Sequence, residues 1–205
     1  NKKVILSTGM ATLEEIHAAV KILEDNGTED ISILHCTTEY PTKYPDLNLN
    51  VISTLKKEFP NQKIGYSDHS IGYEVPIAAA TLGAVIIEKH FTLDNDMPGP
   101  DHKASATPDI LERLVKGVRI VETSLGKYEK EPVEAEIKNK IVARKSIIAK
   151  KAIKKGEVFT EENITTKRPG NGISPMNWYD ILGKVSEYDF EEDMLIKHSG
   201  FKNQE

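Results

Sequence analysis

Four short β-branched runs alternate with amphipathic helical segments over residues 1–126. The runs begin near residues 4, 31, 63 and 84, and each is followed by a polar turn and then by apolar residues at helical spacing. Apolar strands separated by helices predict a parallel sheet covered by helices, with functional residues at the carboxyl ends of the strands. Four such units are half of an eight-stranded barrel, and an open four-stranded sheet satisfies the same pattern.

The expected helices have recognisable ends. They cover residues 12–24, 49–59 and 75–82, and a fourth begins near residue 107. Thr12 with Glu15 makes the pattern of a capping box. The first helix then stops at Asn26-Gly27. The fourth helix has Pro108 in its first turn, where proline is tolerated.

The pattern changes after Gly126. Residues 127–140 are dense in charge and predict a linker or a solvated helix. Residues 141–205 carry short β-like runs at 146–149 and 157–160, separated by turns. We therefore expect a partial barrel, a linker and a small β-rich domain near the lower size limit for independent folding.

Composition argues against several functional classes. The net charge of -5 and the aromatic content of 6% disfavour nucleic-acid binding. No apolar run approaches the roughly 20 residues of a membrane span. The single cysteine, Cys36, excludes an internal disulfide framework and fits a reducing compartment, so we expect a cytoplasmic protein. The sequence contains no glycine-rich nucleotide loop and no GxSxG nucleophile elbow.

Polar residues follow all four expected strands. They are Ser7-Thr8, Thr37-Thr38-Glu39-Tyr40, Ser67-Asp68-His69 and Glu88-Lys89-His90. Because strand side chains alternate, Ser67 shares a face with His69, and Glu88 shares a face with His90. Two imidazoles at the mouth of a barrel suit a divalent metal that keeps open positions for water and substrate. The alternative is that both histidines are hydrogen-bonded rim residues.

The other histidines and the loop after the fourth strand are interpreted differently. His35 lies within a strand and is expected to pack structurally, and His17 and His198 are expected to be solvated. Asp101 follows a stiff Met-Pro-Gly-Pro segment beyond the fourth strand. Loops on this face often carry specificity, although a polar surface loop is the alternative.

Several long motifs closely resemble the sialic acid synthase family. In the first part they are residues 34–41 (LHCTTEYP), 65–70 (GYSDHS), 88–93 (EKHFTL) and 98–102 (PGPDH). In the second part, residues 143–146 (ARKS), 167–170 (KRPG), 172–175 (GISP) and 182–184 (LGK) resemble the antifreeze-like (SAF) domain of those enzymes. The resemblance implies an α/β fold: the second half of a (β/α)8 TIM barrel, followed by a small β-rich SAF domain of the β-clip type.

The resemblance also implies a reaction. Members of the family condense phosphoenolpyruvate with N-acetylmannosamine, or with a related N-acyl amino sugar, and water, giving a nonulosonate (a sialic acid) and phosphate. By this resemblance His69 and His90 hold a divalent metal, with Mn²⁺ expected first and Mg²⁺ or Co²⁺ as alternatives. These two histidines and Glu88 are then the expected catalytic residues. The motifs leave the acceptor sugar open.

Further residues receive roles from the same resemblance. Ser67 and Thr8, or its neighbour Ser7, are expected to bind the carboxylate or phosphate of phosphoenolpyruvate. Tyr40, Glu88 and Asp101 are expected to hold hydroxyls of the acceptor sugar. Thr38 stands where some relatives carry asparagine, so its contact is a weaker expectation. Arg168 is expected to reach over the barrel of a partner subunit in a homodimer and to contact the N-acyl group.

The chain departs from the family in its length. The first four βα units are absent, and with them the family's lysines for phosphoenolpyruvate and a glutamate for proton transfer. We therefore expect a truncated carboxyl portion with two open sheet edges that is inactive alone. Two other functions stay open: a metal-dependent barrel aldolase or isomerase acting on a sugar phosphate, and a non-catalytic binding module.

Overall fold

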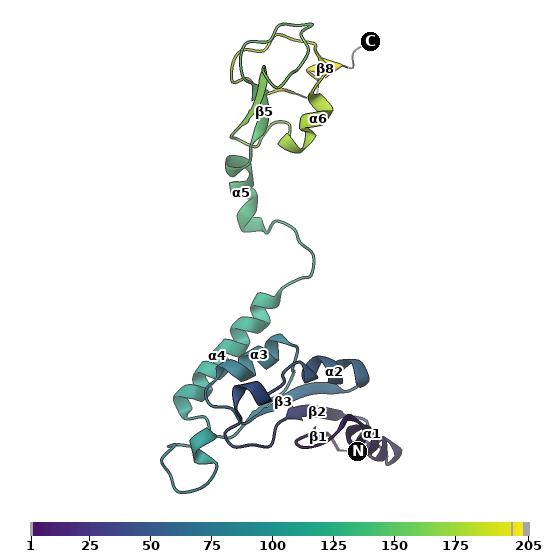
Figure 1. Ribbon diagram of the computed structural model, residues 1–205, viewed down its shortest axis with the longest axis vertical. Coiled ribbons are helices and arrows are strands. Elements are labelled where there is room, and N and C mark those ends of the chain that lie inside the picture. The colour runs from purple at the N-terminus through teal and green to yellow at the C-terminus, as the bar shows by residue number, and fades with distance from the viewer. Residues whose placement is uncertain (1, 198, 203–205) are drawn as a thin grey trace. The chain divides into compact units, whose positions relative to one another are not determined.

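The chain folds as two compact units, Asn1–Tyr128 and Glu129–Glu205, and each is described by itself. The computed structural model describes residues 2–197 and 199–202 (Figure 1). His198, one of the histidines expected to be solvated, lies outside the described residues. None of the helices in the described ranges is both long and apolar enough to cross a membrane.

The first unit alternates strands and helices (Figure 1). Its strands are β1 (Val4–Ser7), β2 (Ile31–Cys36), β3 (Lys63–Asp68) and β4 (Ile87–Lys89), and its helices are α1 (Leu13–Asp25), α2 (Val51–Glu58), α3 (Glu74–Thr81) and α4 (Pro108–Leu125), with short 3₁₀ turns η1 (Tyr44–Asp46) and η2 (His102–Ala104). The capping box predicted at Thr12 and Glu15 is confirmed at the start of α1.

The four strands form one parallel sheet in the order β1-β2-β3-β4. Each crossover therefore moves one strand in the same direction, which is the order of a barrel, whereas a doubly wound sheet reverses its direction. Helices α1, α2 and α3 pack against the strands in one core. The buried core residues include Ile16, Val20, Ile33, Ile52, Leu55, Ile64 and Tyr66.

The fourth strand begins later than the apolar run that predicted it. We expected a strand over residues 84–87, but β4 is Ile87–Lys89, and Val85 is exposed. Pairing with β3 does begin earlier, since Val85 N donates to the Ile64 carbonyl. The apolar run marks the lead-in from α3, whereas the polar residues Glu88 and Lys89 belong to the strand because they pair with Ser67 and Asp68 in the ladder. Their side chains also find partners on β3.

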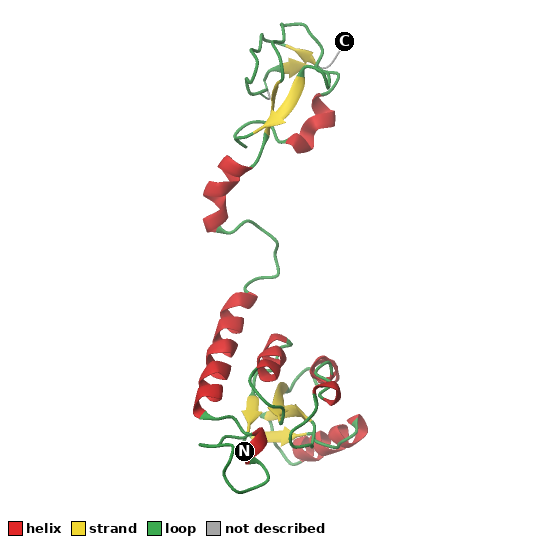
Figure 2. Cartoon of the chain, turned by 60° about the vertical axis from the view of Figure 1, so that its left-hand side comes forward, coloured by secondary structure: helices red, strands yellow, loops and turns green. Residues whose placement is uncertain are grey.

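The second unit is small and rich in β structure (Figure 2). Its elements are α5 (Glu134–Ala143), β5 (Ser146–Ala149), β6 (Ile164–Lys167), η3 (Pro175–Asn177), α6 (Trp178–Ile181), β7 (Val185–Ser186) and β8 (Phe201–Lys202). Strand β5 pairs with β6, and β7 pairs with β8, both antiparallel. A separate core contains Ile147, Ile153, Phe159, Ile164, Ile173, Phe190 and Ile196.

The prediction of a strand at residues 157–160 in this unit is wrong. Residues 157–160 form only an isolated bridge, between Val158 and Val185, rather than a ladder. The segment turns immediately afterwards, because the Asn163 side chain accepts a hydrogen bond from Thr160 N and donates one to the Val158 carbonyl. The strand that pairs with β5 is instead β6, whose sequence ITTK contains a single apolar residue and so gave no apolar run.

Candidate functional site at the carboxyl ends of the strands

The predicted site residues on β3 and β4 lie side by side. Ser67 and Glu88 are Cα partners in the parallel ladder, and the Ser67 hydroxyl donates a 2.7 Å hydrogen bond to Glu88 Oε1. His69 lies two residues after Ser67, and His90 lies two residues after Glu88. Each histidine is one residue beyond the end of its strand. Alternation therefore brings both histidines to the face that carries Ser67 and Glu88.

Three rings cluster at this point. The His69 and His90 ring centroids are 5.3 Å apart, with the ring planes at 72°. Tyr40, from the loop after β2, stacks on His69 at 4.1 Å and meets His90 edge-on at 5.5 Å. The structure thus brings together three residues that lie far apart in the sequence.

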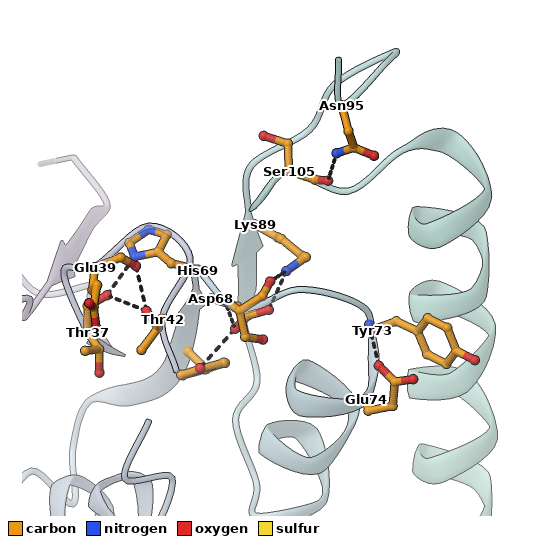
Figure 3. A network of polar contacts seen from close by, with 12 residues as sticks. Thr37, Glu39, Thr42, Asp68, His69, Tyr73, Glu74, Lys89, Asn95 and Ser105 are labelled. Atoms are coloured by element: carbon orange, nitrogen blue, oxygen red, sulfur yellow. Dashed lines mark hydrogen bonds and ion pairs between the residues drawn. The ribbon is translucent and has the colours of Figure 1, made fainter. Parts of the chain in front are cut away.

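The hydrogen bond of the His69 ring decides which of its nitrogens is available at the site. His69 Nδ1 lies 2.7 Å from the Thr37 carbonyl oxygen (Figure 3). A carbonyl only accepts, so Nδ1 carries the proton and Nε2 keeps its lone pair. His90 Nδ1 lies 3.8 Å from Asp101 Oδ2, an ion-pair distance that is too long for a hydrogen bond. The hydrogen bond to Thr37 therefore orients the His69 ring, with its Nε2 as the nitrogen available to a ligand.

The imidazoles of His69 and His90 fit the chemistry of a divalent metal site. Neutral imidazole is a common ligand of Mn²⁺, Zn²⁺ and related ions, and a carbonyl or carboxylate behind the ring fixes its tautomer. Within the described ranges, no group of three or more His, Cys, Asp or Glu residues is arranged to hold a metal ion. The nitrogen donors that the strand ends bring together are the imidazoles of His69 and His90.

Tyr40 is held as a neutral phenol. Burial raises its pKa above the ordinary value, and the negative charges of Cys36, Asp101 and Glu88 in their ionised forms raise it further. A neutral phenol can donate its hydroxyl proton to a ligand oxygen. Tyr40 is 43% exposed, so this donor is accessible to a bound molecule.

The residues at the end of β1 differ in what they can donate. Thr8 is buried and its hydroxyl donates a 2.8 Å hydrogen bond to the Leu34 carbonyl, whereas Ser7 is exposed. Thr38 lies directly against Gly9, where an added Cβ would fall 2.1 Å from the Thr38 hydroxyl oxygen. Gly9 thus permits the close approach of the β1 and β2 loops.

Asp101 is presented by a loop that is fixed from within. The Asn95 side-chain amide donates to the carbonyls of His102 and Ser105, at 2.6 and 2.9 Å. Thr92 Oγ1 lies 2.8 Å from His102 Nδ1. These bonds fold the segment back toward the end of β4, where Asp101 meets His90.

Arg168 belongs to the second unit, whereas the strand-end cluster belongs to the first. Its side chain is exposed, and its Nε donates a 3.0 Å hydrogen bond to the Ala143 carbonyl at the end of α5. The predicted reach of Arg168 into a partner subunit is not tested by this single chain.

His35 and His17 behave as the sequence predicted. His35 is buried in β2, with its Nε2 2.7 Å from the Leu47 carbonyl, and burial lowers its pKa. His17 is half exposed on α1, where it contacts Glu58 and the Phe59 ring. Cys36 is a buried free thiol.

Sequence reasoning gave no role to Asp68 and Lys89, although each directly precedes a candidate histidine. Lys89 Nζ lies 2.6 Å from Asp68 Oδ2, and both side chains are almost completely buried (Figure 3). The repeated order of acid-His and Lys-His at two strand ends was a usable signal, because neighbouring parallel strands place such residues side by side.

Comparisons with known proteins place these features in a family. The NeuB family model matches residues 1–130, and the SAF domain model matches residues 144–202. N,N'-diacetyllegionaminic acid synthase from Campylobacter jejuni is 49% identical over 199 residues, covering 96% of this chain and 59% of the relative. Human N-acetylneuraminate-9-phosphate synthase is 36% identical, covering 95% of this chain and 54% of the relative. The chain thus spans less than two thirds of each relative.

Solved structures show the same fold. A putative spore coat polysaccharide biosynthesis protein E from Chromobacterium violaceum matches with a TM-score of 0.71 and 28% identity, over 98% of this chain and 61% of that one. An N-acetylneuraminic acid synthetase from Leptospira borgpetersenii matches with a TM-score of 0.61 and 40% identity, over 67% of this chain and 47% of that one.

The fold class and the resemblance predicted from the sequence are confirmed. The parallel sheet has the strand order of a barrel half, and the matched structure covers nearly the whole chain. The barrel-type match and the SAF match follow one another along the sequence. Since the first of these models covers more than half of the residues, the chain belongs to the NeuB family and carries an SAF domain.

Proposed function

We propose that the full-length protein condenses phosphoenolpyruvate with an N-acyl amino sugar and water, giving a nonulosonate and phosphate. Relatives named as synthases of legionaminic, pseudaminic and sialic acids support a synthase of this kind. The observation that carries the proposal is the pair of imidazoles, His69 and His90, whose ring centroids lie 5.3 Å apart at the strand ends. A sugar-phosphate aldolase or a plain binding module would not account for that pair together with the SAF domain.

The reaction balances without a redox partner. The enol carbon of phosphoenolpyruvate forms a bond to the aldehyde carbon of the sugar, and water adds to the carbon that bore the phosphate. Phosphate then leaves by cleavage of its carbon–oxygen bond, which gives the 2-keto acid. A divalent ion held by His69 and His90, with Mn²⁺ proposed first, would supply Lewis acidity to the aldehyde oxygen.

The residues of the chain then have distinct tasks. Tyr40 donates its neutral hydroxyl to a sugar oxygen, and the carboxylates of Glu88 and Asp101 accept from sugar hydroxyls. Ser67 exchanges its hydrogen bond to Glu88 for one to phosphoenolpyruvate. Ser7 is better placed than Thr8 to donate to the anion, because the Thr8 hydroxyl proton is already used on Leu34.

The assembly is also part of the proposal. We propose a homodimer in which Arg168 of the SAF domain contacts the N-acyl group at the partner's barrel. Its exposed guanidinium supports this role, since among the described residues the hydrogen bond it makes is that of Nε to the Ala143 carbonyl. We place the reaction in the cytoplasm, in keeping with the single free thiol, Cys36.

Phosphate release by the full-length protein tests this function. Phosphoenolpyruvate and Mn²⁺ are supplied with either N-acetylmannosamine or a 2,4-diacetamido sugar, with and without chelator. We expect metal-dependent release with one acceptor, and a loss of at least about a hundredfold in H69A and H90A, because each removes a ligand. The control H17A removes a half-exposed histidine of α1 and is expected to keep the activity. No release with either acceptor would contradict the proposal.

A further inference from the structure

Lys89 binds both neighbours of His69. Its ammonium donates to Asp68 Oδ2 at 2.6 Å and to the Ser70 carbonyl oxygen, so it holds the residues directly before and after the histidine. Lys89 is itself the residue directly before His90. One side chain therefore connects the local backbone of the first imidazole to that of the second.

The ion pair is buried and fully engaged. The side chains of Lys89 and Asp68 are 4% and 0% exposed. Asp68 Oδ1 accepts hydrogen bonds from the Tyr66 hydroxyl and from Ser70 N, both at 3.0 Å. The carboxylate thus has three donors, which is the condition under which a buried ion pair holds one geometry.

The pair lies on the opposite face of the sheet from the histidines. Asp68 and Lys89 are Cα partners in the ladder, as Ser67 and Glu88 are, and consecutive strand side chains point to opposite faces. Tyr66, on the same face as Asp68, belongs to the core that β3 forms with the helices. Asp68 and Lys89 therefore do not contact the site directly.

The histidines need such support because the regular ladder stops just before them. Strand β3 ends at Asp68 and β4 ends at Lys89, so strand pairing no longer fixes His69 and His90. What holds the two histidines here comes from other segments. The His69 carbonyl accepts a hydrogen bond from Thr42 N, and its ring bonds the Thr37 carbonyl. The His90 carbonyl accepts a hydrogen bond from Ala106 N, and its ring lies 3.8 Å from Asp101. Between the two strand ends themselves, the buried ion pair is the cross-strand side-chain link closest to the histidines.

We propose that Asp68 and Lys89 are positioning residues that fix the separation and orientation of His69 and His90 and thereby set the affinity for the divalent metal. The inference rests on the proposed function, which makes these imidazoles the metal ligands. Residues behind metal ligands typically change metal affinity 10- to 100-fold when they are altered. A buried ion pair can also stabilise the fold without positioning the histidines. The experiment therefore measures thermal stability and metal affinity separately.

The double variant D68N/K89M makes this separation. It removes both buried charges together, and neutral replacement of a whole buried pair is often tolerated, whereas removal of one partner leaves an unpaired charge. In the full-length protein we expect a thermal unfolding midpoint close to wild type but a Mn²⁺ dissociation constant raised by about 10- to 100-fold, measured from free Mn²⁺ by electron paramagnetic resonance. K89R, which can still donate to both partners, is expected to bind Mn²⁺ as wild type does.

A second readout needs no metal. In metal-free protein labelled with ¹⁵N-histidine, we expect the wild-type His69 signals to report a proton on Nδ1, and the double variant to show a mixture of tautomers. The matched control K21M/D25N removes an exposed pair on α1 and is expected to change neither readout. If the double variant does not fold, the second neutral pair D68L/K89M carries the same expectations, since it also removes both buried charges together.

The outcomes are distinguishable. Unchanged imidazole signals, or wild-type Mn²⁺ affinity, in a folded variant would overturn the positioning role. If wild-type protein itself fails to bind Mn²⁺, the metal assignment of the proposed function is wrong, and the imidazole signals still decide whether the pair positions the histidines.

Discussion

His35 and His69 each bond a backbone carbonyl through one ring nitrogen, but their surroundings give them different properties. His35 lies within β2, buried beside the Tyr66 ring, and burial lowers its pKa while the bond to Leu47 opposes that shift. His69 lies one residue beyond β3, where its ring contacts the rings of Tyr40 and His90. At the scale of single residues, position along the strand thus separates a structural imidazole from a candidate ligand.

The lowered pKa of His35 predicts a dependence of stability on pH. The folded state holds His35 neutral, so the stabilisation is complete above the unfolded value of about 6.5 and is lost as pH falls below it. We expect the free energy of unfolding to fall between pH 7.5 and pH 5.5, and H35Q to weaken that dependence, measured by urea unfolding. The control K21Q changes an exposed lysine of α1 and is expected to keep the wild-type slope. An unchanged slope in H35Q would contradict the assignment.

Helix α1 shows how local rules act at the scale of an element. Its capping box closes in both directions, with Thr12 N donating to Glu15 Oε2 and Glu15 N donating to Thr12 Oγ1. The box fixes the first turn of the helix that follows β1. That turn begins just after Gly9, where the β1 loop approaches Thr38.

The capping box predicts that alanine lowers the free energy of unfolding at Thr12 but not at Thr54. T12A removes the cap and is expected to lower the free energy of unfolding by about 1 kcal/mol. T54A replaces an exposed threonine within α2, where alanine has the higher helix propensity, so no loss is expected. Chemical denaturation of both variants checks the difference, and equal losses would argue against a specific cap.

At the scale of the whole molecule, the chain has two cores with no residue in common. One is built from β1–β4 and their helices, and the other from the short strands of the SAF domain. Functional residues are divided in the same way, with the imidazole pair in the first unit and Arg168 in the second. The two units can therefore be perturbed separately.

A cavity in the second core tests this division. I147A removes a fully buried side chain next to Phe159 and Ile164 in that core, and is expected to cost about 2–5 kcal/mol. Hydrogen exchange should therefore accelerate at the amides of β5 and β6, while the amides of β3 keep their wild-type rates. I141A, at a half-exposed position of α5, is the matched control and should leave exchange in β5 unchanged. Faster exchange in β3 of I147A would contradict separate cores.

The sequence by itself determined the order of βα units and the residues that meet at their ends. Apolar runs and helical spacing act over a few residues, so the helices, the capping box and three of the four strands follow from local pattern. The motif-based resemblance then predicted the fold class and the family, and both are confirmed. The roles assigned to the site residues stay predictions, for His69, His90, Glu88, Tyr40, Ser67 and Asp101 as much as for Ser7, Thr8, Thr38 and Arg168.

Only the tertiary structure decided how the site is held. The start of β4, the pairing of β5 with β6, the proton on His69 Nδ1 and the bond between Asp68 and Lys89 all depend on partners from other segments. Asp68 and Lys89 are 21 residues apart, and what joins them is the register of two strands. Local spacing carries no information about that register, because it is set by burial and backbone pairing across the whole sheet.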